Sequence, residues 1–132
     1  MAPSVSVLAV DLANNVGILS AFMGQDPEAL GEFEQMVLLA VLRGGDQAYG
    51  VTVHEELQRH SARRVARGAV YMTLDRLETK GLLTSSLTQP IAARGGKSRR
   101  CYRVTPTATT ALRATRRTLL SLWDGLEPAL EK

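Results

Sequence analysis

The sequence predicts a mainly α-helical domain that carries one small β-hairpin and ends in a long helix. Three observations predict this class. Apolar residues recur at helical spacing in three successive segments between residues 32 and 81. Two short segments rich in β-branched and aromatic residues, 82–88 and 99–105, flank a turn that contains Pro90, Gly95 and Gly96. After residue 105 a further helical repeat closes the chain.

The composition limits the class of protein. A chain of 132 residues with 45% hydrophobic and 5% aromatic residues is typical of one globular domain. Its single cysteine excludes an internal disulfide framework and suits a reducing compartment. The first basic residue is Arg43, so no signal peptide is expected, and the longest early apolar run, residues 7–10, is too short to cross a bilayer. We therefore expect a cytoplasmic protein without a membrane partner.

Residues 1–29 form an N-terminal extension for which two interpretations stay open. A weak helical stripe runs through this segment, and polar residues and a glycine interrupt it. The stripe comprises Val5, Leu8, Leu12, Val16 and Leu19. Alternatively, Met23 is the natural start, and residues 1–22 are a loosely ordered extension.

Two helices are expected after this extension. The first begins near Glu32, has an apolar stripe and ends at "RGGD", residues 43–46. That stripe comprises Phe33, Met36, Val37, Ala40 and Val41. The second helix is expected over residues 49–59, with Val53 and Leu57 facing inward. The segment "RHSARRVA" then connects it to a third helix that begins at about residue 67.

The third helix lies in "RGAVYMTLDRLETKGLL", residues 67–83, and has an unusual outer face. Val70, Leu74 and Leu77 form its apolar stripe, and Gly68 and Ala69 begin the opposite side. Glycine weakens a helix by about 1 kcal/mol relative to alanine, so an exposed glycine here indicates that something approaches closely. The expected outer face consists of Arg67, Gly68, Ala69, Met72, Thr73, Arg76 and Lys80.

The charges favour a polyanionic partner at this face. Residues 59–103 carry eleven Lys and Arg against two acids, whereas residues 24–56 carry seven acids against one base. A basic block alone is equally typical of a solvated surface, but this one coincides with the third helix. Three helices followed by a basic hairpin are the order of a winged helix-turn-helix domain, here residues 30–104, whose third helix enters the major groove. The hairpin residues expected at the DNA backbone are Arg94, Lys97, Arg99 and Arg100.

The closing segment, residues 105–132, is expected to be a dimerisation helix. Thr105 is its predicted cap, Pro106 occupies the first position, and the helix should run to about residue 126. Leucines and a threonine recur along one side at the spacing of a helix that pairs with a partner. The predicted homodimer interface comprises Leu112, Thr115, Leu119, Leu122, Trp123 and Leu126.

The sequence also resembles the PadR-like transcriptional regulators. The segments "LGEFEQMVLLAVL", "YGVTVHEEL", "GAVYMTLDRLETKGLL" and "RGGKSRRCYRVTP" match that family in order and spacing, over residues 30 to about 112. The resemblance is to the short class with a single C-terminal helix. It implies a bacterial cytoplasmic homodimer, usually a repressor, with the last helix at the dimer interface.

The resemblance implies two further roles, each with an alternative. The Tyr71 hydroxyl would reach a phosphate, or Tyr71 is a core-edge residue. Trp123 would stack on a small aromatic effector, or it covers the dimer interface. Ala66 departs from the family because it stands where Ser, a natural N-cap, is frequent. Further departures are Ala108 for a common Gly, Cys101 for a frequent aromatic, and the long N-terminal lead.

These observations predict a sequence-specific DNA-binding regulator, a repressor that binds a pseudo-palindromic operator as a homodimer. A winged-helix module for protein contacts is the alternative. No nucleophile, carboxylate pair or phosphate loop stands at a meaningful spacing, so neither an enzyme nor a bound cofactor is expected. No metal site is expected either, since His54 and His60 lack partners at ligand spacing. Cys101 beside Arg100 is interpreted as an inert strand residue, with a redox sensor as the alternative.

Overall fold

The computed structural model of the chain describes residues 30–89, 95 and 98–130. The N-terminal extension, including Met23, therefore lies outside the described residues. So do Arg94 and Lys97 at the predicted tip of the hairpin.

Three helices form the core of the domain. They are α3 (Glu32–Gly44), α4 (Gly50–His60) and α5 (Arg67–Thr79), and the short 3₁₀ helix η1 (Gly45–Gln47) joins the first two. Each agrees with the sequence prediction to within a few residues, and α3 packs on both α4 and α5. The apolar stripes meet in the centre, where large side chains are fully buried. These are Val37, Leu38, Val53, Val70, Leu74, Leu77 and Leu83.

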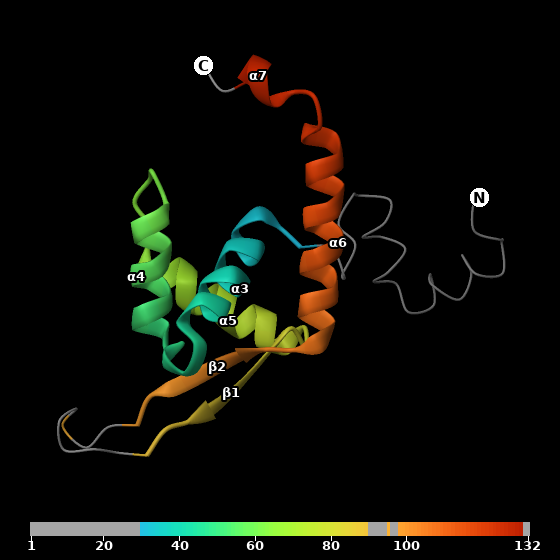
Figure 1. The fold of residues 1–132 in the computed structure, drawn as a ribbon. Coiled ribbons are helices and arrows are strands. Elements are labelled where there is room, and N and C mark those ends of the chain that lie inside the picture. The colour runs from blue at the N-terminus through green and yellow to red at the C-terminus, as the bar shows by residue number, and fades with distance from the viewer. Residues whose placement is uncertain (1–29, 90–94, 96–97, 131–132) are drawn as a thin grey trace, which may run out of the picture. The chain divides into compact units, whose positions relative to one another are not determined.

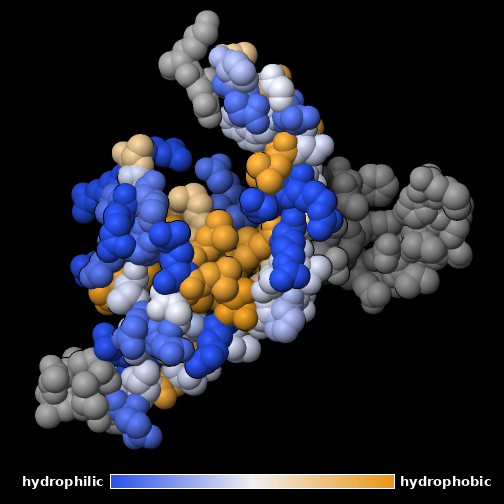
Figure 2. Space-filling model, viewed as in Figure 1, coloured by the Kyte–Doolittle hydropathy of each residue, from blue (hydrophilic) through white to orange (hydrophobic). Residues whose placement is uncertain are grey.

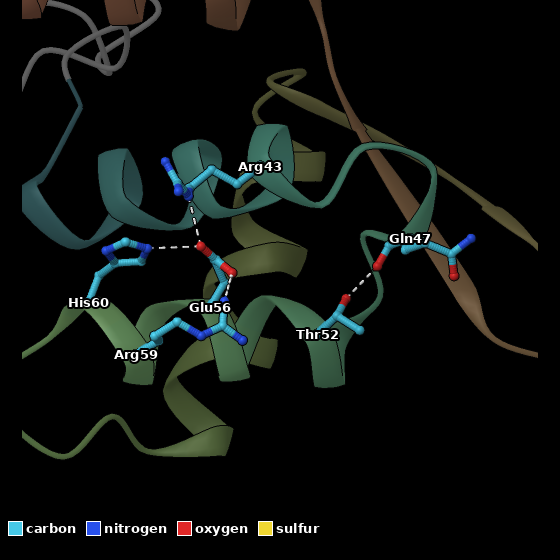
Figure 3. Close-up of polar contacts among 6 residues, drawn as sticks. All are labelled: Arg43, Gln47, Thr52, Glu56, Arg59 and His60. Carbon is cyan, nitrogen blue, oxygen red and sulfur yellow. Dashed lines mark hydrogen bonds and ion pairs between the residues drawn. The ribbon is translucent and has the colours of Figure 1, made fainter.

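An ionic cluster around Glu56 also joins α3 to α4 (Figure 3). Arg43 Nε of α3 lies 2.7 Å from Glu56 Oε1, His60 Nε2 lies 2.9 Å from the same oxygen, and Arg59 pairs with Oε2. The hydrogen bond from Arg43 is the main cause that lowers the pKa of Glu56, and His60 and Arg59 lower it further against the opposing effect of burial. The cluster therefore favours the ionised carboxylate at the surface of the two helices.

The predicted hairpin is present and is fixed to the turn before α4. Its strands β1 (Leu83–Leu87) and β2 (Arg100–Val104) pair antiparallel, with Ser85 opposite Tyr102. The Tyr102 amide donates to Ala48 O at 2.9 Å, and Tyr49 forms a bridge with Cys101. Tyr102 is buried, and burial raises the pKa of its hydroxyl, with the charge of Asp75 adding to the shift. The hairpin is thus anchored where α4 begins.

The closing helix α6 (Pro106–Trp123) begins as predicted but ends early. The Thr105 hydroxyl accepts a hydrogen bond from the Ala108 amide at 3.2 Å, which caps the helix behind Pro106. The expected continuation to residue 126 is wrong, because Asp124 leaves helical geometry and Gly125 adopts a φ of 82°. Leu126 consequently lies in the turn before the short helix α7 (Glu127–Leu130), not on the stripe of α6.

Figure 1 shows α3 lying between α4 and α6, with the hairpin at one end of the helices. Of the eighteen residues of α6, Ala108 alone is buried. Most of this helix thus presents its side chains to the surroundings. Within the described part of the chain, every helix is too short or too polar to cross a membrane.

Candidate nucleic-acid interface

The outer face of α5 combines small and basic residues, as the sequence predicts. Arg67, Gly68, Ala69 and Arg76 are all exposed, and Met72 is 65% exposed. Among the described residues, neither arginine side chain has an ion-pair or hydrogen-bond partner. The face therefore has one free guanidinium group on each side. Between them, at the start of the helix, it has no bulky side chain.

Thr73 is a correction to the predicted face, because its side chain is only 4% exposed. Successive residues of an α-helix turn by about 100°, so Thr73 lies about 60° from Val70 and shares the buried side of the helix. The sequence prediction placed Thr73 on the exposed side of the helix, whereas it lies next to the apolar stripe. A threonine buried in this way has no surface to offer to a DNA base.

Sequence reasoning missed Asp75, which is exposed on α5. It lies seven residues after Gly68 and three after Met72, a spacing that places all three on one side of the helix. The same spacing was present in the sequence and would have identified it. Asp75 adds one carboxylate to a face that is otherwise neutral or basic.

Tyr71 is 43% exposed, and its ring lies against the first residue of α4. A Cβ atom at Gly50 would stand 2.2 Å from Tyr71 Cε1 and 2.9 Å from its hydroxyl oxygen. Real Cβ atoms do not approach other atoms so closely, so only glycine leaves room for the ring here. The structure therefore places the Tyr71 hydroxyl beside the start of α4, where free backbone amides attract anions.

The two arginines at the turn end of the paired strands have different surroundings. The Arg99 guanidinium carbon lies 4.0 Å from the centre of the Tyr49 ring, and its Nε is buried without a hydrogen-bond partner. Arg100 is exposed, and its Nη1 donates to Ser85 Oγ at 2.9 Å. The Ser85 hydroxyl in turn donates to Glu78 Oε2 at 2.7 Å. Arg99 is thus held against the protein, whereas Arg100 extends along the hairpin surface.

A second surface feature is an apolar groove between α3 and α6, with a volume of about 460 Å³. Figure 2 shows hydrophobic side chains gathered between these two helices. Of the predicted dimer residues, Leu112, Leu119 and Trp123 line this groove, whereas Thr115 and Leu122 do not. Sequence reasoning missed its other walls, which include Leu39, Leu42, Arg113, Arg116 and Leu120.

These groove residues leave large apolar side chains in contact with water. Leu39, Leu42 and Leu119 are 48%, 51% and 46% exposed, and Trp123 is 42% exposed. Leu122, outside the groove, is 67% exposed. A contiguous apolar surface of this kind is typical of an interaction site.

Among the described residues, no group of three or more His, Cys, Asp or Glu side chains could hold a metal ion.

Comparison with known proteins gives consistent matches. The model of a family described as the transcriptional regulator PadR-like family matches residues 38–114. The transcriptional regulator Rv3488 of Mycobacterium tuberculosis is 42% identical over 77 residues, which cover 58% of this chain and 67% of that protein.

Solved structures of similar fold include two PadR-family regulators. The one from Clostridium difficile R20291 has a TM-score of 0.60 at 19% identity, over 76% of this chain and 99% of its own. The one from Eggerthella lenta has a TM-score of 0.56 at 25% identity, over 95% of this chain and 98% of its own. Both matches support the winged-helix architecture derived above.

Proposed function

The chain belongs to the PadR-like family of transcriptional regulators, and on this premise we propose that it is a repressor that binds a pseudo-palindromic operator as a homodimer. The family consists of DNA-binding regulators and not of enzymes. In the proposed complex α5 lies in the major groove and the hairpin contacts the flanking backbone. Repression is what the resemblance to the family implies, and activation is the alternative.

The position of Gly68 carries the proposal for α5. Gly68 is exposed, and a Cβ atom added there would meet no protein atom within 4 Å. Its helical backbone is equally accessible to alanine, which would stabilise the helix. Nothing in the folded chain therefore requires glycine at this position. In the proposed complex, glycine is required because a nucleic-acid backbone or base edge approaches closely to the start of α5.

The residues around Gly68 divide into two proposed roles. Arg67, Met72 and Arg76 face base edges, where arginine pairs with guanine and an apolar side chain contacts a thymine methyl group. Tyr71, Ala69 and Arg100 lie nearer the sugar-phosphate backbone, where contacts supply affinity without sequence information. Arg99 also contributes positive charge to the hairpin from its place on Tyr49. Arg94 and Lys97 remain predicted backbone contacts from the sequence.

The exposed side of α6 supports the homodimer. A helix of eighteen residues that buries only Ala108 gains little from its own domain. Pairing with a second copy would cover Leu119, Leu122 and Trp123, and would close the groove against α3. Leu112 and Thr115 lie closer to the domain, at the base of this interface, and Leu126 beyond α6 would lie at its edge. Two-fold symmetry in the protein then matches two-fold symmetry in the operator.

Trp123 is the proposed contact for a small aromatic effector. It lines the groove together with Arg116 and Leu120, so a flat aromatic molecule would find a stacking surface and a cation there. The alternative is that Trp123 only covers the dimer interface. Because Trp123 is the only tryptophan, quenching of its fluorescence by added phenolic compounds separates the two roles.

Footprinting on the protein's own upstream region tests the proposal, with sedimentation of the same complex. We expect two protected half-sites with centres about 10 bp apart or slightly more, bound by two chains. Protection of one asymmetric half-site by one chain would contradict the homodimer. Equal affinity for upstream and random DNA would favour the winged-helix module that makes protein contacts.

A further inference from the structure

The recognition helix α5 begins without a side-chain cap. Its N-cap residue is Ala66, whose methyl group cannot accept a hydrogen bond from the first-turn amides. The first helical hydrogen bond, from the Val70 amide to Ala66 O, is long at 3.3 Å. An exposed helix start without a side-chain cap is expected to fray. Yet Arg67, Gly68 and Ala69, which are proposed to contact or closely approach DNA, lie in this first turn.

Two side chains of α4 hold the residue that precedes the cap. The Val65 amide donates to Gln58 Oε1 at 2.8 Å, and Val65 O lies 2.7 Å from His54 Nε2. Gln58 Nε2 also donates to Arg63 O at 3.2 Å, and the Val65 side chain is only 8% exposed. His54 and Gln58 are four residues apart, so they project from the same side of α4. We call these two side chains and their bonds the α4 clamp.

The chemistry of the two groups fixes the direction of the hydrogen bond between His54 and Val65. A carbonyl oxygen only accepts hydrogen bonds, so His54 Nε2 must carry the hydrogen in this contact. Both polar groups of the Val65 backbone are then satisfied by α4, and neither is left to water. The peptide that enters α5 is therefore held in one orientation, and the extended Ala66, with φ −75° and ψ 135°, follows from it.

We propose that His54 and Gln58 are positioning residues that orient the start of α5 in place of the missing N-cap. The inference rests on the proposed function, because it assigns the clamp to DNA recognition. With the clamp in place, Arg67 and Gly68 are presented to the DNA in a fixed direction. Without it, the first turn of α5 frays and operator binding weakens more than binding to random DNA, because base contacts depend on orientation more than phosphate contacts do.

The test combines removal of the clamp with restoration of the cap. The variants are His54→Ala, Gln58→Ala and both together, each with and without Ala66→Ser. Glu55→Ala is the matched control, since Glu55 is exposed on the same helix and has no described partner. His54→Gln is the conservative variant, because a glutamine amide retains an N–H donor.

The first measurement is hydrogen exchange of the Val70 and Tyr71 amides without DNA. Loss of one hydrogen bond should accelerate exchange about tenfold, and Ala66→Ser should restore much of the protection. Glu55→Ala should leave both rates unchanged, and His54→Gln should lie close to the parent. If protection at these amides survives loss of the clamp in folded single variants, the inference is wrong.

The second measurement is the ratio of operator affinity to random-DNA affinity. We expect this ratio to fall about tenfold in the single variants and to recover with Ala66→Ser. An unchanged ratio would overturn the positioning role, and so would a fall that Ala66→Ser fails to reverse. If the parent protein binds no operator but the exchange results hold, the proposed function fails while the clamp stands. The two failures are therefore distinguishable.

Discussion

The ring of Tyr71 occupies the space that a side chain at Gly50 would need, with Tyr71 Cε1 only 2.2 Å from where a Cβ would lie. Tyr71 of the recognition helix α5 thus packs directly on Gly50, the first residue of α4. This contact places the Tyr71 hydroxyl beside the start of α4, where backbone amides attract anions.

Gly50→Ala should displace the Tyr71 ring. Overpacking of this kind costs about 1–3 kcal/mol, so the free energy of unfolding should fall by that amount and operator affinity should fall with it. Chemical denaturation measures the first effect and fluorescence anisotropy the second. In a Tyr71→Ala background the clashing atoms are absent, so the same Gly50→Ala change should cost much less. Equal costs in both backgrounds would show that the ring is not the obstacle.

Gly68→Ala should separate stability from DNA binding. Because the added methyl group meets no protein atom, the free energy of unfolding should rise by about 0.5–1 kcal/mol. Affinity for the operator should nevertheless fall, since the methyl group obstructs close approach of the DNA. Glu55→Gly is the control, because Glu55 is exposed on α4 outside the proposed DNA face, and it should lower stability while it preserves binding. A more stable Gly68→Ala protein that binds as tightly as the parent would remove the main support for the proposed contact.

The hairpin arginines should contribute affinity rather than specificity. Replacing Arg99 and Arg100 together by alanine should weaken binding to operator and random DNA alike, and should flatten the dependence of log K on log salt by about 1–2 units. Arg59→Ala is the control, because Arg59 is equally cationic but paired with Glu56 on α4. A parental salt dependence in the double variant would mean that the hairpin arginines are solvated and do not touch phosphates.

Leu119→Asp should abolish dimerisation and operator binding together. An unpaired carboxylate in an apolar interface costs several kcal/mol, and loss of one half-site also removes the gain from bivalent attachment. Weak binding to random DNA should survive, since α5 and the hairpin stay intact. Thr110→Asp is the control on the opposite side of α6, nine residues away at 100° per residue. A Leu119→Asp protein that sediments as a dimer would place the interface elsewhere.

The Glu56 cluster should make stability depend on pH in the acid range. The pKa of Glu56 is lower in the folded protein than its ordinary value of 4.5, chiefly through Arg43. Its contribution is therefore complete above pH 4.5 and is lost as the pH falls through the folded-state pKa. Glu56→Gln should destabilise the protein at pH 7, and the difference from the parent should shrink below pH 4.5. Arg43→Gln should weaken this trend in denaturation curves recorded across this range, because it removes the main partner of Glu56.

The helices and strands were predictable because their buried sides repeat at regular spacing. The error at Thr73 shows the limit of that approach, since a polar residue 60° from the centre of an apolar stripe is still inside the core. The end of α6 was wrong for a different reason. The turn residues Asp124 and Gly125 end the helix although the leucine spacing continues to Leu126, so the turn signal outweighs the spacing.

Other contacts could not be predicted from side-chain patterns at all. His54 and Gln58 bind backbone atoms of Val65, and backbone atoms are the same at every position of a sequence. The groove along α6 was only half anticipated, because its α3 wall depends on which leucines the core leaves out. Leu38 is fully buried, whereas Leu39 and Leu42 on the same helix are about half exposed.

The tripeptide Ala48–Tyr49–Gly50 contacts two distant parts of the chain, the hairpin and α5, through three consecutive residues. Ala48 O accepts a hydrogen bond from the Tyr102 amide, and the Tyr49 ring packs against the Arg99 guanidinium. Gly50 leaves the space that the Tyr71 ring occupies. A substitution at one of these positions alters the packing site of a residue far along the sequence. Among related proteins, divergence here should therefore arrive in coupled pairs, with position 49 varying together with 99 and position 50 with 71. Selection from a randomised library would recover such pairs far more often than either member alone.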